Sequence, residues 1–184
     1  MKKIVFSLLI SICFLLSCKK EGNSYSDKVE RVRVNFFLNV NPNHSLTPFF
    51  QSNHHIGTDT WEPLLFPMKR FEYKPGFIYD LLAVRRNTPM PASPGAVAYK
   101  LIKVVSIEKV ANDVPFTVYL KGISKSYVTG DINKGYQLLN QIDIDCNSYC
   151  AALENALKKD NNLKGTFIRN ENGSFKLVGL TPTP

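Results

Sequence analysis

The 184-residue sequence has few of the residue types on which most catalytic and metal-binding sites depend. It holds three histidines, four cysteines and one tryptophan. It has no Gly-x-Ser-x-Gly, phosphate-binding or dinucleotide-binding pattern, and its histidines show no His-Glu-x-x-His or other recognised ligand spacing. The sequence therefore predicts no catalytic residue, no cofactor and no metal, and it favours a protein that is not an enzyme.

Long apolar runs are also lacking. The longest mostly apolar run, residues 4–16, follows two lysines and would span roughly 20 Å as a helix, whereas a bilayer core is about 30 Å thick. A basic start, a short apolar run and a small residue at its end are typical of a secretory signal. The run closes on Leu15-Leu16-Ser17-Cys18, which resembles the lipobox of bacterial lipoprotein precursors.

That resemblance implies that residues 1–17 are a signal peptide and that Cys18 becomes a lipidated N-terminus anchored in the membrane. Residues 18–28 would then form a short flexible tether, and residues 29–184 a single β-rich domain. Lys19 follows the cysteine, which in this family favours the outer membrane, on its periplasmic or its surface-exposed side. The predicted location is therefore the cell envelope.

The charge of the chain points to no nucleic-acid partner. The formal net charge is +8, but the basic residues are scattered along the chain, whereas nucleic-acid binding needs a concentrated basic patch. A mild attraction to anionic lipid headgroups or acidic glycans is the most that this charge supports.

Few cysteines remain for a disulfide. Cys13 would leave with the signal peptide and Cys18 would be lipidated, so only Cys146 and Cys150 remain. On a regular helix, Cβ atoms four residues apart lie about 5–6 Å apart, while a disulfide needs roughly 3.5–4.5 Å. A bond therefore requires an unwound first turn. An exported compartment favours oxidation, so a disulfide and two buried core thiols both remain open.

Alternation with a period of two dominates the rest of the chain and predicts strands. In the first of them, residues 29–40, alternate apolar residues from Val32 to Val40 are expected on one face. Asn172-Gly173 predicts a hairpin with a two-residue turn, and Pro75-Gly76 predicts a turn between strands at 70–73 and 77–86. The other predicted strands are 98–108, 114–122, 136–144, 165–169 and 175–179.

One helix is expected late in the chain. Cys146, Tyr149, Leu153 and Leu157 fall on a single helical face, and Asp145 or Asn147 can cap the start. The predicted fold class is therefore α+β. It is mostly antiparallel, with about eight strands in an open sheet or partial barrel and one late helix.

Two segments show no periodicity. Residues 41–67 hold all three histidines and the tryptophan, and a loop of that length is usually functional, mobile or a misassigned element. Residues 87–95 contain three prolines, which predicts a stiff, exposed excursion.

Residues around Pro75-Gly76 resemble a known family. The stretches FEYKPGFIYDLLAV (71–84) and YKLIKVVS (99–106), with Trp61 ahead of them, resemble the domain of unknown function numbered 4377. The resemblance covers roughly residues 29–110. It implies a small bacterial envelope protein and implies no activity. The matching positions are Trp61, Phe71, Tyr73, Pro75, Gly76, Phe77, Tyr79, Leu81, Tyr99, Leu101, Val104 and Ser106.

Three functional hypotheses follow. The leading one is a non-enzymatic binding module that holds a glycan, a peptide or an envelope protein through loops 41–67 and 87–95, with Phe49, Phe50 and Trp61 as its binding surface. The second is a hydrolase with a metal or histidine site in loop 41–67, which requires His44, His54, His55 and Asp59 to converge. The third is a structural envelope component without a small ligand.

Overall fold

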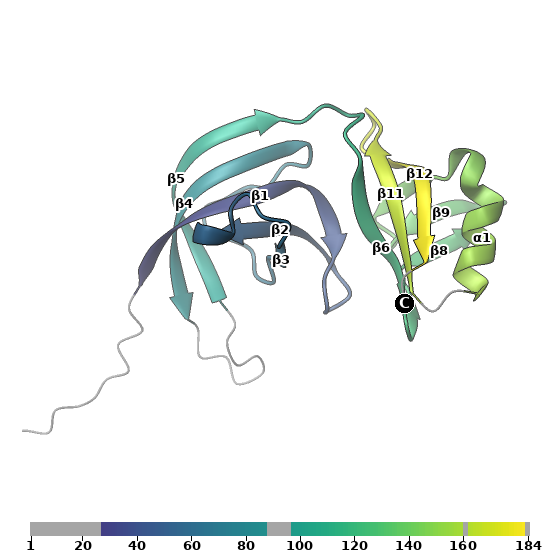
Figure 1. The fold of residues 1–184 in the computed structure, drawn as a ribbon, viewed down its shortest axis with the longest axis horizontal. Helices are drawn as coiled ribbons and strands as arrows, with labels where there is room; N and C mark the ends of the chain where they lie inside the picture. Colours follow the sequence, from purple (N-terminus) through teal and green to yellow (C-terminus); the bar gives the residue numbers. More distant parts are fainter. Residues whose placement is uncertain (1–26, 88–96, 160–161, 183–184) are drawn as a thin grey trace, which may run out of the picture.

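The computed structural model describes residues 27–87, 97–159 and 162–182. Within these ranges twelve strands form two sheets, joined by the linker between residues 109 and 116 (Figure 1). The prediction of a β-rich, mainly antiparallel fold with one late helix is confirmed. The predicted count of about eight strands is wrong, because the predicted strand at 136–144 is two strands, the one at 70–73 does not form, and four strands form in segments where none was predicted. Both sheets are open.

The first sheet takes the N-terminal half of the described chain, and its strand order is β3-β2-β1-β4-β5. All its strand pairs are antiparallel. A single parallel bridge joins Lys69 to Lys100, next to the start of β5. The strands of this sheet are β1 (Lys28–Val40), β2 (Leu46–Ser52), β3 (Glu62–Pro63), β4 (Phe77–Asn87) and β5 (Val97–Lys109).

Strand β1 keeps its predicted alternation only in its first half. Val32 and Val34 are fully buried in the core of the first sheet. The register with β2 then shifts between Val34 and Leu38, and Val40 enters the core of the second sheet instead. The shift adds two residues to β1, so Val40 lies opposite Leu46 with the same parity as Val34 opposite Phe50. The alternating residues of β1 nevertheless enter two different cores, because the end of the strand reaches the second sheet.

The second sheet contains the C-terminal half of the described chain, and its strand order is β7-β6-β11-β12-β10-β9-β8. Its pairs are antiparallel except for β10 with β12, which is parallel. The elements are β6 (Phe116–Gly122), β7 (Lys125–Ser126), β8 (Val128–Asp131), β9 (Gly135–Leu138), β10 (Ile142–Asp145), α1 (Cys150–Lys159), β11 (Leu163–Arg169) and β12 (Phe175–Pro182).

The predicted strand 136–144 is in fact two strands. β9 and β10 pair as a hairpin, because Leu139 and Asn140 adopt positive φ angles of 50° and 56°. Alternation of apolar residues continues through this turn, so the sequence pattern alone does not reveal it. A similar correction applies to Asn172-Gly173. The predicted hairpin forms, but its loop runs over residues 170–174 and is closed by the Asn170 N–H donating to the Ser174 carbonyl at 2.9 Å.

The late helix α1 begins after a 3-10 turn at Asn147–Tyr149. It buries Leu153 completely, and Ala156 and Leu157 pack against the same core. Figure 1 shows α1 at the end of the second sheet that is remote from the first sheet. Within the described residues no helix is both long and apolar enough to cross a membrane.

Loop 41–67 contains two strands, β2 and β3, that the sequence did not predict. β2 forms although its periodicity is hidden, because the polar residues Thr47 and Gln51 are buried and satisfied by hydrogen bonds. Conversely, residues 70–73 form no strand, and only the predicted turn at Pro75-Gly76 is present, with Gly76 at φ +91°.

The two sheets contact each other through specific polar groups. The Asn39 amide donates to the Thr117 carbonyl at 3.3 Å and accepts from the Tyr119 N–H at 3.2 Å, so a β1 side chain pairs with the backbone of β6. The Arg169 guanidinium of β11 donates to Asn112 in the linker at 2.6 Å and lies against Gly76, where any Cβ would collide with it.

Candidate binding cavity beside strand β2

A cavity of about 530 Å³ opens beside the start of β2. Four separate stretches of the chain enclose it: the turn before β2, the start of β2 itself, the segment after β3, and the segment before the Pro75-Gly76 turn. The lining residues are Asn41, Ser45, Leu46, Thr47, Pro48, Leu64, Leu65, Pro67, Met68, Phe71, Glu72 and Tyr73.

The turn that forms one wall is fixed by Asn41. Its side-chain oxygen accepts from the N–H groups of Asn43 at 2.9 Å and Ser45 at 3.1 Å. Its amide donates to the Ser45 hydroxyl at 2.8 Å. An asparagine side chain that bonds its own downstream backbone is a common turn former. Here it lets His44 adopt a positive φ of 57° and leaves Asn41 only 4% exposed.

The opposite wall is joined to β2 by backbone and side-chain hydrogen bonds. The Leu64 N–H donates to the Pro48 carbonyl at 3.0 Å, and the Thr47 hydroxyl donates to the Leu64 carbonyl. Leu64 and Met68 then turn into the core of the first sheet, while Leu65 stays 42% exposed. The cavity therefore has an ordered floor and an apolar side chain at its open side.

Aromatic side chains form the third wall. Phe71 packs edge-on against Tyr79, with ring centroids 5.0 Å apart. Tyr73 lies beside the same ring at 6.2 Å. The Tyr73 hydroxyl is enclosed by protein and has no hydrogen-bond partner among the described residues. Burial raises the pKa of Tyr73 well above its ordinary value, Tyr79 adds to the rise and Arg169 opposes it. Tyr73 therefore stays neutral.

The chemistry of the lining is mostly apolar. Eight of the twelve lining residues are aliphatic, aromatic, methionine or proline. The side chains of Asn41, Ser45 and Thr47 already make hydrogen bonds within the protein. Glu72 is exposed and makes no ion pair with any described residue. An apolar pocket with one charged group is the usual composition of a small-ligand site.

A polar cluster of Tyr99, Glu30 and Arg85 lies at one end of the first core. The Tyr99 hydroxyl donates to the Glu30 carboxylate at 3.1 Å, and Arg85 lies 3.7 Å from the other Glu30 oxygen. Glu30 is only 7% exposed. Burial, together with the Glu30 charge, raises the pKa of Tyr99 to about 12. Tyr99 is thus held as a proton donor to a buried carboxylate, which is a structural role.

The predicted binding surface does not line the cavity. Phe50 is 6% exposed and packs edge-on against Tyr99 in the first core. Phe49 and Trp61 are partly exposed, and neither is a lining residue. Most of the predicted loop 87–95 lies outside the described residues, as do Cys18 and the signal peptide.

The histidines of loop 41–67 do not converge. The His44 ring lies 5.5 Å from the ring of Tyr127 in the second sheet. His54 and His55 lie on a 3-10 turn at Asn53–His55 with their rings 4.0 Å apart. In the described ranges no three His, Cys, Asp or Glu side chains are grouped to hold a metal ion.

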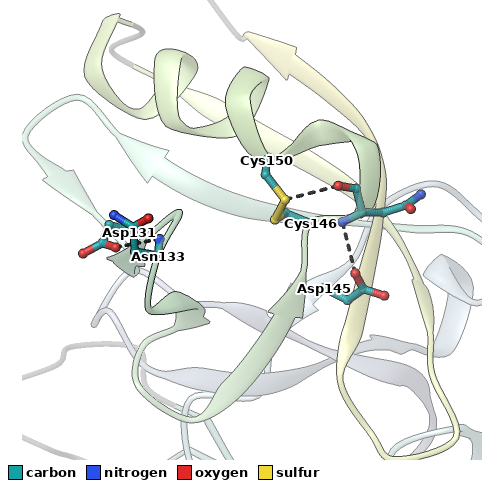
Figure 2. Close-up of a disulfide and its surroundings, with 6 residues drawn as sticks. Asp131, Asn133, Asp145, Cys146 and Cys150 are labelled. Atoms are coloured by element: carbon teal, nitrogen blue, oxygen red, sulfur yellow. Dashed lines mark hydrogen bonds between the residues drawn. A yellow bond between two sulfur atoms is a disulfide. The ribbon is translucent and has the colours of Figure 1, made fainter.

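Cys146 and Cys150 are joined by a disulfide, with their Cα atoms 4.9 Å apart (Figure 2). The helix is unwound into the 3-10 turn at this point, as the geometry of such a short bridge requires. Asp145 accepts from the Asn147 N–H at 3.0 Å and the Cys150 sulfur lies 3.2 Å from the Asn147 carbonyl, so the start of α1 is held by both side chains.

Residues 131–135 form the turn between β8 and β9. The Asp131 carboxylate accepts from the Asn133 N–H at 2.9 Å (Figure 2). It also accepts from the Lys134 N–H at 3.0 Å. These backbone hydrogen bonds lower the pKa of Asp131. One of the two Asp131 carboxylate oxygens is therefore used inside the turn.

Eight of the twelve lining residues lie in loop 41–67, which the sequence proposed as a binding segment. The residues singled out there, Phe49, Phe50 and Trp61, do not line the cavity, and Phe71 and Tyr73 were assigned to a strand. The only available signal was the long aperiodic segment itself, which marked residues 41–67 as unusual. The cavity also depends on β2, and that strand was hidden by its buried polar residues.

Comparisons with known proteins assign the chain to no family. No family model matches the chain, and neither a curated protein nor a solved structure matches it. The resemblance to the domain of unknown function numbered 4377 therefore stays a prediction that depends on the residues quoted for it.

Proposed function

We propose that this protein is a lipid-anchored, non-enzymatic binding module of the bacterial envelope, and that it binds its ligand in the cavity beside β2. The observation that carries the proposal is the cavity itself: about 530 Å³, apolar walls, an ordered turn on one side and a single free carboxylate, Glu72. Pockets of roughly this size and composition hold small ligands or single side chains of a partner.

Among the ligand classes that the sequence suggested, the lining favours a peptide over a glycan. A sugar is recognised through many free hydrogen-bonding groups, but Asn41, Ser45 and Thr47 use theirs within the protein. An apolar peptide side chain fits the space between Leu64, Leu65 and Phe71. A neighbouring lysine or arginine of the peptide would meet Glu72, which has no basic partner among the described side chains.

The proposed anchor is compatible with such a role. β1 begins at Lys28, ten residues after Cys18, and ten residues reach at most about 35 Å. A lipidated Cys18 would keep the cavity close to its membrane, where segments of envelope proteins are concentrated. Peptides from such proteins are the ligand class that we propose.

The experiment is a titration of the full chain, in detergent, with short synthetic peptides that alternate leucine with lysine or leucine with glutamate. Soluble cell-wall oligosaccharides form a third set of probes. We expect the leucine–lysine peptides to bind, and binding to be weakened at least about tenfold, or 1.4 kcal/mol, in Leu65→Arg, which blocks the open side. Glu72→Lys should reverse the preference between the two peptide sets.

The matched control is Glu171→Lys, which reverses an exposed carboxylate on the loop between β11 and β12 and should leave binding unchanged. Binding that Leu65→Arg does not alter would show that the cavity is not the site. If the oligosaccharides bind and the peptides do not, the ligand class is a glycan instead of a peptide. No binding of any probe would favour a purely structural component.

A further inference from the structure

β5 differs from every other strand at a sheet edge. Among the described strands four lie at edges: β3 and β7 have two residues each, β8 has four, and β5 has thirteen. An edge strand presents unpaired N–H and C=O groups, and proteins usually keep such strands short or cover them. β5 is long, and described residues pair with only part of its outer edge.

The cover extends over only the first part of β5. The Lys69 N–H donates to the Tyr99 carbonyl and the Leu101 N–H donates to the Lys69 carbonyl, both at 3.0 Å. Beyond Leu101 no described residue pairs with the outer edge of β5. All eight residues from 102 to 109 are exposed.

This uncovered part of β5 carries large apolar side chains. Ile102, Val105 and Ile107 are more than half exposed, and Val104 is 37% exposed. Single exposed apolar residues are ordinary, but several in sequence on one free edge are typical of an interaction surface.

The sequence of this edge is complementary to itself. We propose that a second copy of this chain pairs antiparallel with β5, about a two-fold axis between Val105 and Ser106. In that register Lys103 lies opposite Glu108 of the second copy, and Val104 lies opposite Ile107 of the second copy. Each of these pairs occurs twice because the axis repeats them.

The faces of the sheet agree with this register. Lys103 and Glu108 pair with Leu82 and Ile78 of β4, which lie on the same face of that strand. Val104 and Ile107 pair with Leu81 and Tyr79, which lie on the opposite, core-facing side. A two-fold axis perpendicular to the sheet keeps each residue on its own face. It therefore brings opposite charges together on one face and apolar side chains together on the other.

One feature of β5 opposes pairing. The register with β4 shifts at two places, beside Val105 and beside Ile102, and bulges of this kind are one way in which edge strands avoid association. The charge complementarity of Lys103 with Glu108 is the reason to prefer a second copy. A monomer whose edge is protected by these bulges is the competing outcome.

The test is sedimentation equilibrium of the full chain, with the density of the detergent matched by the solvent, from about 1 μM to about 1 mM. We expect a monomer–dimer equilibrium. Lys103→Glu and Glu108→Lys should each weaken it at least about tenfold, because each places like charges opposite one another. The double variant Lys103→Glu/Glu108→Lys should recover the original equilibrium, since the opposite pairing is restored. Lys125→Glu, on the short edge strand β7, is the matched control and should change nothing.

Three results would overturn the proposal: a monomer over the whole concentration range, a dimer that neither single variant weakens, or a double variant that stays as weak as the single ones. The first result would indicate that the bulges protect the edge, and the second that the chain associates elsewhere. Circular dichroism spectra of all variants should be alike, because the exchanged side chains are exposed. These outcomes are independent of ligand binding at the cavity.

Discussion

The two sheets differ in what they bury. Seven polar or charged residues are buried among the described residues, and six of them lie between Glu30 and Gln51, in or beside β1 and β2. From residue 109 onwards only one described polar residue, Ser174, is buried, and the second core has thirteen buried side chains, including Val40 of β1, against nine in the first. Buried polar groups contribute less to stability than apolar ones of the same size. The second sheet is therefore the stable scaffold.

The differences at the surface follow the same division. The second sheet ends in the short strands β7 and β8, and a disulfide holds the start of its helix. The first sheet carries the cavity beside β2 and the long free edge of β5. The second sheet has a cavity of about 570 Å³ of its own, beside Tyr136, whose buried hydroxyl has no hydrogen-bond partner among the described residues. The long edge of β5 is therefore the feature that distinguishes the first sheet, and we infer from it that this sheet has the interaction role.

The largest expected effect compares one residue from each core. Phe167 is fully buried in the second core, and Met68, 3% exposed, forms the wall between the first core and the cavity. Phe167→Ala should lower the free energy of unfolding by about 3–5 kcal/mol and Met68→Ala by about 2–3 kcal/mol, because a site that already borders a cavity loses fewer contacts. Urea denaturation measures both. An equal or larger loss of unfolding free energy in Met68→Ala would contradict the claim that the second core is the more stable one.

A smaller effect is expected from a buried polar residue of the first sheet. The Gln51 amide donates to the carbonyls of Thr58 and Thr60 and accepts from the Gly57 N–H, while the side chain is only 2% exposed. Gln51→Ala leaves these backbone groups without their partner, so it should cost about 1–3 kcal/mol. Gln137→Ala, an exposed glutamine bonded to Asp143, is the control and should cost well under that in the same urea titration.

The smallest expected effect concerns pH. Arg33 donates two hydrogen bonds to Asp80, at 2.8 and 2.9 Å. These bonds lower the pKa of Asp80 below its usual 3.8. Because the folded pKa is lower than the unfolded one, the stabilisation is present above pH 3.8 and is lost as the pH falls through the lowered pKa.

Because the pair is partly exposed, its contribution should be about 1 kcal/mol or less. Asp80→Asn should therefore slightly lower the free energy of unfolding at neutral pH. It should also remove part of the stability loss that the unmodified protein shows in acid. Thermal unfolding between about pH 2 and 7 measures this. An unchanged acid profile in Asp80→Asn would show that Arg33 and Asp80 do not interact in solution.

The sequence predicted those parts of the fold in which pattern and burial agree. α1 has apolar residues on one face, and the first half of β1 has strict alternation, so both were found. β2 was missed because Thr47 and Gln51 are polar and buried, which contradicts the simple rule that apolar residues lie inside. The break at Leu139 and Asn140 was missed because Leu139 has no sequence signal for a positive φ angle, and Asn140, a residue type that adopts one more often, was the only hint.

The candidate site could not be predicted for a different reason. Its walls come from residues near 41–48, 64–68 and 71–73, and only the folding of β2 against the segment after β3 brings them together. Loop 41–67 was correctly marked as unusual, but Phe50 was assigned to a surface and lies in the core. Leu65 and Glu72 can be assigned to the site only from their neighbours in the fold, which the sequence does not identify.

Hydrogen–deuterium exchange of the full chain tests the division between the two sheets most directly. We predict the slowest exchange in β6, β11 and β12, whose amides lie in the apolar scaffold, and faster exchange in residues 41–52 and 62–73 around the cavity and along β5 after Leu101. The reverse order, with the first sheet protected longer than the second, would contradict the assignment of scaffold and interaction surface.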